Sequence, residues 1–207
     1  MRKPPSPAPN KKAKTISDAV KALLDASNAD VRHAKHVTSL ALKLFDKLVE
    51  IHTLSSRERL LLKVAAMLHD IGWSRTTNGG HHKHSRDMII GAELPEITDR
   101  ERNICALIAR YHNKAEPDAS RHGSYAALKR SDQMIVSWLA AILRVADGFD
   151  CLHNNKITVA GCKIDKKSLT ISLAAKKDCT AEIRGAKRKS GFLARMSGRD
   201  LTFKPCP

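Results

Sequence analysis

Two residue types that bind metal ions stand side by side at the end of a strongly apolar stretch. The stretch, residues 60–73, reads LLLKVAAMLHDIGW, so His69 and Asp70 follow a nearly continuous hydrophobic run. As a helix this run must be buried almost all round, and we expect it to be the central helix. Burying an imidazole and a carboxylate is costly unless something compensates, and a divalent metal ion is the commonest compensation for this pair. We therefore predict a metal site here, with Gly72 ending the helix as a left-handed cap.

Two further polar residues interrupt apolar helical faces elsewhere in the chain. His33 lies on the apolar stripe of a long helix predicted from Asp30 to about His52, in which hydrophobic residues recur at steps of three and four. Asp147 lies near the end of an apolar helix predicted from Gln133 to about Phe149. A bundle can bring residues from separate helices to one point, so these side chains are expected to join His69 and Asp70.

The remaining helices are marked by their starts. Ser55 and Glu58 have the spacing of a capping box before the apolar run, and Thr98 and Glu101 have it before a helix that continues to His112. Aromatic residues make up only 4% of the 207 residues, against 42% hydrophobic and 28% charged residues. A core built from Leu, Ile, Val and Ala favours packed helices.

The chain divides into three parts by composition. Residues 1–14 are rich in Pro and basic residues and are expected to be a disordered basic tail. Residues 15–153 carry the helical periods, and residues 154–207 form a small α+β module. In that module, residues 156–164 and 168–174 alternate as a hairpin, and a basic amphipathic segment, about residues 180–197, precedes a strand at 201–203.

The overall charge and the cysteines limit the setting. The net charge is +16 at pH 7, which favours polyanions such as nucleic acid, nucleotides, polyphosphate or an anionic surface, although a solvated basic surface without a partner is the alternative. The five cysteines are odd in number and form no C-x-x-C pair, which is typical of reduced thiols. No segment is apolar enough for a leader or a membrane span, so we expect a cytoplasmic protein that does not contact membranes.

The order of the polar residues is similar to a known pattern. A His, an adjacent His-Asp and a distant Asp resemble the HD superfamily of metal-dependent phosphohydrolases, which implies an HD-type helical bundle. By that resemblance a divalent metal is held by His33, His69, Asp70 and Asp147. His84 and His112 stand where two-metal members carry extra histidines, and are candidates for a second ion with Asp70 as the bridging ligand. His81 and His82 would serve equally well.

A closer resemblance covers residues 30–204. The strings that carry it are HVTSLALKLFDKL, LLLKVAAMLHDIGW, GHHKHS, LIARYHNK and LRVADGFD, followed by the basic β-β-α-β tail. They resemble the C-terminal half of the exopolyphosphatase/guanosine pentaphosphate phosphohydrolase (Ppx/GppA) family. In that family the phosphohydrolase site belongs to N-terminal actin-like domains, which we do not expect in this chain, so the resemblance does not transfer that activity. It implies a homodimer, which an exposed sheet edge would also permit.

The expected function is that of a metal-dependent phosphohydrolase acting on a phosphate ester or anhydride, either a nucleotide or a polyphosphate-related compound. It would use one or two ions of Mn, Fe, Co, Ni, Mg or Zn. Catalytic roles are expected for Asp70, His112 and Lys114, with Arg110 and Arg144 as further candidates for holding phosphate oxygens.

A non-catalytic module that binds polyphosphate, a nucleotide or a partner protein is the alternative, because the resemblance is to the accessory half of a larger enzyme. The basic C-terminal segment is a candidate surface for polyphosphate or nucleic acid. Its residues are Arg184, Lys187, Arg188, Lys189, Arg195, Arg199 and Lys204.

Overall fold

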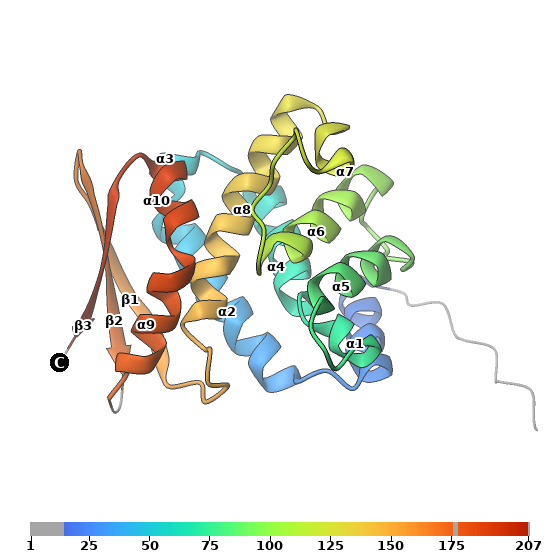
Figure 1. Ribbon diagram of the computed structural model, residues 1–207, viewed down its shortest axis with the longest axis horizontal. Coiled ribbons are helices and arrows are strands. Elements are labelled where there is room, and N and C mark those ends of the chain that lie inside the picture. The colour runs from blue at the N-terminus through green and yellow to red at the C-terminus, as the bar shows by residue number, and fades with distance from the viewer. Residues whose placement is uncertain (1–14, 176–177, 207) are drawn as a thin grey trace, which may run out of the picture.

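A helical bundle makes up most of the molecule, and a small sheet with two helices lies at one end of it (Figure 1). The computed structural model describes residues 15–175 and 178–206, so the predicted basic tail lies outside the described residues. The bundle contains α1 (Ile16–Ser27), α2 (Val31–Lys47), α3 (Val49–His52), α4 (Ser56–Leu68), the 3-10 turn η1 (Ile71–Arg75), α5 (His81–Ile90), α6 (Asp99–Tyr111), α7 (Gly123–Ala126) and α8 (Arg130–Gly148). The predicted class, mainly α with a small C-terminal α+β module, is confirmed.

Capping boxes set the starts of the helices that carry the site. Before α4, Ser55 and Glu58 bond reciprocally to each other's backbone and side chain, and Thr98 and Glu101 do the same before α6, as predicted. Thr15 and Asp18 form a third box, so α1 begins at Ile16.

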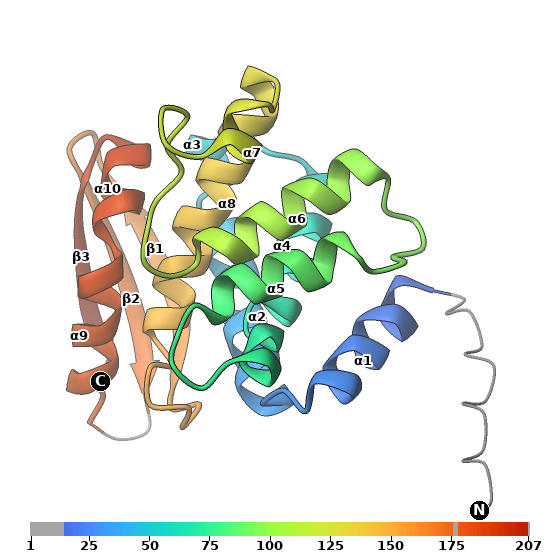
Figure 2. The same cartoon turned by 45° about the vertical axis from the view of Figure 1, so that its right-hand side comes forward.

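The helix at the centre of the fold is α8 rather than the expected α4. Residues 135–150 are buried without interruption, whereas Leu60 and Met67 of α4 are only partly buried. The reason is that α8 contacts α2, α4 and α6 on one side and α9 and α10 of the C-terminal module on the other. The short helix α1 lies at the far end of the molecule from the sheet (Figure 2).

Two predicted boundaries are wrong. The long helix expected over residues 30–52 is interrupted at Leu48, where α2 gives way to the single turn α3. The apolar helix stops at Leu68, and Gly72 lies within η1 and not in a left-handed conformation. Glycine is required at this position for close packing, because a Cβ there would lie 2.0 Å from the carbonyl oxygen of His81.

The C-terminal module consists of β1 (Ile157–Ile164), β2 (Ser168–Ala175), α9 (Thr180–Lys189), α10 (Gly191–Ser197) and β3 (Asp200–Cys206). The sheet has the order β1-β2-β3, antiparallel between β1 and β2 and parallel between β2 and β3. The expected basic segment is thus two helices, and the last strand is longer than expected. At the contact of α8 with α9, a Cβ on Gly148 would lie 2.6 Å from the Cα of Ala186, so the two backbones meet closely.

None of the helices within the described ranges has the length and apolarity that a membrane span requires.

Candidate metal centre

Histidine and aspartate side chains from several helices converge at one place inside the helical bundle. The contributing elements are α2, α5, α8 and the residues directly after α4 and α6, and the side chains are those of His33, His69, Asp70, His81, His112 and Asp147. All four ligands expected for the first ion are therefore brought together. They come from positions up to 114 residues apart in the chain, from His33 to Asp147.

Ligand atoms in this cluster form two overlapping groups. In each group the ligand atoms lie within 4.8 Å of one another, and the groups are His33, His69 and Asp147, and His69, Asp70 and His112. His33 Nε2 lies 3.5 Å from Asp147 Oδ1, and His69 Nε2 lies 3.6 Å from Asp70 Oδ2 and 3.7 Å from Asp147 Oδ1. His69 is fully buried and belongs to both groups.

Three of the histidines are held by their Nδ1 atoms. The Nδ1 of His33 bonds to Asp150 Oδ2 at 2.8 Å, while the Nδ1 atoms of His69 and His112 bond to the carbonyl oxygens of Ala66 and Ala109 at 2.7 Å each. Each carbonyl partner lies three residues earlier in the same segment, so the local helix end fixes the ring. Bonds of this kind orient an imidazole and leave its Nε2 lone pair for a metal ion.

Three of the polar atoms that face the centre lack hydrogen-bond partners among the described residues. Within the described residues, His33 Nε2, His69 Nε2 and Asp70 Oδ1 are buried without one. A buried polar atom without a partner costs on the order of 1–3 kcal/mol, so three at one point indicate a missing binding partner. Imidazole and carboxylate donors together suit Mn, Fe, Co, Ni or Zn. The residues present therefore fit a divalent metal ion.

Protons on the histidines balance the negative charges of the aspartates in the cluster. Burial opposes protonation of His33, but the nearby carboxylates of Asp147 and Asp150 outweigh this and raise its pKa to about 9. Burial also opposes protonation of His69, but Asp70 and Asp147 outweigh this and raise the pKa of His69 above its usual value. A bound cation would replace these protons, since metal binding to histidine requires the neutral ring.

Both central carboxyl groups are ionised despite burial. The pKa of Asp70 lies well below its usual range because His69, His112 and His81 outweigh the cost of burial. The pKa of Asp147 is also well below its usual range, and there Lys189 is the largest of the favourable influences. Two carboxylates therefore stay available as ligands at neutral pH.

The second-ion candidates lie in different places. His112 is buried, with its Nε2 3.3 Å from Asp70 Oδ1, whereas His84 is half-buried and belongs to neither ligand group. His81 lies where His84 was expected, with its Nε2 3.2 Å from both Asp70 Oδ1 and His112 Nε2. The exposed ring of Trp73 stacks on His81 with centroids 4.1 Å apart.

The basic candidates have separate roles. Lys114 is exposed, two residues beyond His112. Arg144 is buried and donates to the carbonyl oxygens of Tyr111 and Lys114 at 2.8 and 3.2 Å, so it fixes the chain after α6 and is not free for phosphate. Arg110 donates to His82 Nδ1 at 2.9 Å, directly beside the centre.

Three contacts at the centre were not predicted from the sequence. Asp150, which orients His33, stands one helical turn after Asp147, and this spacing is the signal that could have indicated it. Lys189 of α9 contacts Asp147, although the sequence suggested only a surface role for this lysine. His153 stacks on His33 at 3.7 Å and so also holds that ring.

The predicted basic surface is divided in the fold. Arg184, Lys187 and Arg188 are exposed on α9, but Arg195 pairs with Glu116 and Arg199 donates to the carbonyl oxygens of Asp165 and Ser197. Arg195 thus joins the module to the helical bundle, and Arg199 holds parts of the module together.

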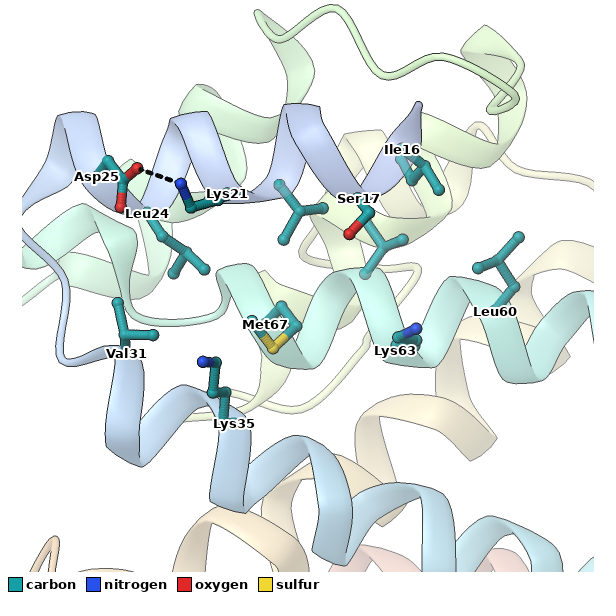
Figure 3. Close-up of a pocket in the computed structure, with 12 residues that line it drawn as sticks. Ile16, Ser17, Lys21, Leu24, Asp25, Val31, Lys35, Leu60, Lys63 and Met67 are labelled. Atoms are coloured by element: carbon teal, nitrogen blue, oxygen red, sulfur yellow. Dashed lines mark ion pairs between the residues drawn. The ribbon is translucent and has the colours of Figure 1, made fainter. Parts of the chain in front are cut away.

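A cavity of about 330 Å³ lies apart from the centre, between α1, α2 and α4 (Figure 3). Leu24, Val31 and Met67 form apolar walls, and Lys35 and Lys63 extend along it. None of the converging histidines or aspartates lines this cavity, so the cavity is separate from the His/Asp cluster.

Residues 17–184 match the protein-family model described as Ppx/GppA phosphatase, domain III. This range takes in the His/Asp cluster, Asp150 and the first part of α9. Because the match covers most of the 207 residues, the chain belongs to the Ppx/GppA phosphatase family through its domain III.

Proposed function

We propose that this domain is a metal-dependent phosphohydrolase of the HD type that acts on a phosphate ester or anhydride. The membership in the Ppx/GppA phosphatase family supports a phosphate substrate. The observation that carries the proposal is the common orientation of His33, His69 and His112. Each is bonded at Nδ1, and the Nε2 atoms of His33 and His69 remain buried without a partner among the described residues.

His33, His69 and Asp147 would hold one ion, and Asp70 and His112 would help to hold a second where two bind, because Nε2 is the one unbonded ring nitrogen of His69 and can serve one ion. A bound divalent ion supplies Lewis acidity toward water and phosphate oxygens. Asp150 and the carbonyl oxygens of Ala66 and Ala109 hold the ligand rings in place, which reduces reorganisation when substrate arrives.

The exposure and charge of the side chains around the centre suggest how a phosphate would reach it. Asp70 has the more exposed of the two central carboxylates, with 19% of its side chain accessible against 10% for Asp147. A phosphate would therefore approach from the side of Asp70. Lys189 beside Asp147 adds a positive charge that would attract phosphate oxygens.

The proposal is tested by the metal content of full-length protein purified without chelator or histidine tag, measured by elemental mass spectrometry. We expect about one or two ions of Mn, Fe, Co, Ni or Zn per chain, lost in His69→Ala. His52→Ala is the matched control, because His52 is also buried but bonds to Phe45 and Leu54 away from the centre.

Turnover is then measured with the identified ion against nucleotides, phosphate monoesters and short polyphosphates. Asp70→Ala is expected to abolish it. Protein that cannot be loaded with any of these ions, or turnover that survives both His69→Ala and Asp70→Ala, would contradict the proposal. Tight binding of polyanions without turnover would indicate the non-catalytic module instead.

A further inference from the structure

Arginines from three separate segments line one cleft beside the metal centre. The cleft has a volume of about 220 Å³ and is lined by Arg86 of α5, Arg110 of α6, Arg121 of the segment before α7, and by Tyr111, His122 and Ser124. His82 connects the cleft to the centre. Its Nδ1 accepts from Arg110 at 2.9 Å, and its ring lies edge-on to those of His81 and His112.

The positive charge of the cleft is only partly neutralised. Arg86 pairs with Asp87, its neighbour in the chain, at 2.6 Å. Arg110 contacts His82 and the ring face of Tyr111, neither of which is an anion, and Asp87 is the acidic residue that favours its charge. No Asp or Glu is among the described residues that line the cleft. Guanidinium groups that outnumber the carboxylates of their cleft attract oxyanions, and their planar forks suit phosphate.

Burial strengthens this attraction. Arg110 is half-buried and lines the cleft together with Arg86. A positive charge that is partly shielded from water gains more from an incoming anion than a fully exposed one does. An anion in this cleft would relieve the repulsion between Arg86 and Arg110.

Neutral donors complete the cleft. His122 Nδ1 is buried and has no partner among the described residues, and burial, followed by Arg110, lowers the pKa of His122, so the ring is neutral at pH 7. Ser124 adds an exposed hydroxyl. A neutral imidazole and a hydroxyl can each donate to an oxyanion or accept from a protonated one.

We propose that Arg86, Arg110 and Arg121, with His122 and Ser124, form a phosphate-binding site distinct from the metal centre. Its ligand is a phosphate group of a compound that carries more than one, such as a short polyphosphate chain. The assignment of this ligand as substrate rests on the proposed function. It deepens that function, because a substrate held both at the metal centre and in the cleft must carry more than one phosphate group. The anion site itself needs no metal.

The test is calorimetric titration of the full chain with sodium tripolyphosphate, after treatment with EDTA and its removal, at fixed ionic strength. We expect binding that weakens at least tenfold in Arg110→Gln and in Arg121→Gln. Arg130→Gln is the matched control, because Arg130 is exposed at the start of α8 and its removal changes the net charge equally. Arg121 is exposed, so its variant keeps the test valid if Arg110→Gln fails to fold.

Two outcomes would overturn the proposal. Equal weakening by Arg110→Gln and Arg130→Gln would mean attraction to the overall charge. Binding lost in His69→Ala but kept in both cleft variants would locate the anion at the metal centre. Failure of the proposed function is distinguishable, because arginine-dependent binding can persist in a protein that holds no metal and turns over no phosphate.

Discussion

The ammonium group of Lys189 contacts a carboxylate oxygen of Asp147, and this contact links the C-terminal module to the centre of the bundle. Lys189 is the last residue of α9, and Asp147 lies one residue before Gly148, at which α8 and α9 meet most closely. Glycine at positions 148 and 185 allows the two backbones to approach. The small module therefore contributes a charge to a candidate site whose proposed ligands all belong to the helical part.

Removing this charge should tighten metal binding. Lys189 and a cation both interact with Asp147, and like charges within several ångströms oppose each other by an energy on the order of 1 kcal/mol or more. We expect Lys189→Gln to raise the affinity for Mn²⁺ or Zn²⁺ roughly tenfold by competition titration. Lys187→Gln, on the exposed side of α9, is the control with equal loss of charge. Unchanged or weaker binding in Lys189→Gln would contradict the expectation.

Removal of the metal should destabilise the fold. A ligand that binds only the folded state at a concentration one hundred times its Kd adds about 2.7 kcal/mol, which corresponds to a fall in Tm of roughly 5–10 °C for a chain of this size when it is removed. We expect EDTA to lower the Tm of the wild type by this amount, measured by calorimetry. The Tm of His69→Ala should not respond to EDTA, and a response equal to that of the wild type would rule out this histidine as a ligand.

Sequence periodicity predicted the fold class and the meeting of His33, His69, Asp70 and Asp147. Both predictions rest on local signals, because capping boxes start α4 and α6 and an apolar stripe on α2 turns His33 inward. The site assignment itself remains a prediction. The central position of α8 was not predictable in the same way, since its burial depends on the distant α9 and α10.

Contacts between elements that are distant in the chain could not be predicted from the sequence. The interpretation of Gly72 as a helix cap was wrong. Glycine is needed at this position because the backbone of α5, which lies beyond a loop in the chain, packs directly against it. The choice between His81 and His84 depends on the rotation of α5, which the packing against η1 and α6 decides. Lys189 reaches Asp147 only because β2 and α9 return the chain to α8.

Substitution at Gly72 should lower the stability of the fold. A Cβ there would lie 2.0 Å from the His81 carbonyl oxygen and 2.5 Å from the Ser85 backbone nitrogen, and backbone atoms cannot move aside. We expect Gly72→Ala to cost roughly 2–4 kcal/mol in denaturant unfolding. Gly161→Ala is the control, because a Cβ there meets no atom within 4 Å. Equal stability of the two variants would mean that α5 can shift at little cost.

The two histidines of α5 should differ in their importance for metal. Neither histidine belongs to the two ligand groups, but His81 is buried with its Nε2 3.2 Å from Asp70 Oδ1, while His84 is half-buried. We expect His81→Ala to weaken metal binding by about tenfold or more, and His84→Ala to have a smaller effect, measured as ions retained after dialysis. A larger loss in His84→Ala would favour the original assignment from sequence.

Acid should remove a defined part of the stability through Glu101. Arg57 donates to both carboxylate oxygens, at 2.6 and 2.7 Å, and this pairing, together with Thr98 and against burial, lowers the pKa of Glu101 to about 2 from 4.5. Since the folded pKa lies below the unfolded one, the stabilisation is fully present above pH 4.5 and is lost as the pH falls from 4.5 toward 2.

Glu101→Gln should therefore be less stable than the wild type by about 1–2 kcal/mol at pH 7, a value reduced by the partial exposure of Arg57. The difference should shrink below pH 4.5 and approach zero near pH 2, as measured by urea unfolding at several pH values. Glu50→Gln, at an exposed position on α3, should follow the wild-type profile throughout. A difference for Glu101→Gln that is constant with pH would mean that packing or the capping box, and not the ion pair, is what the substitution removes.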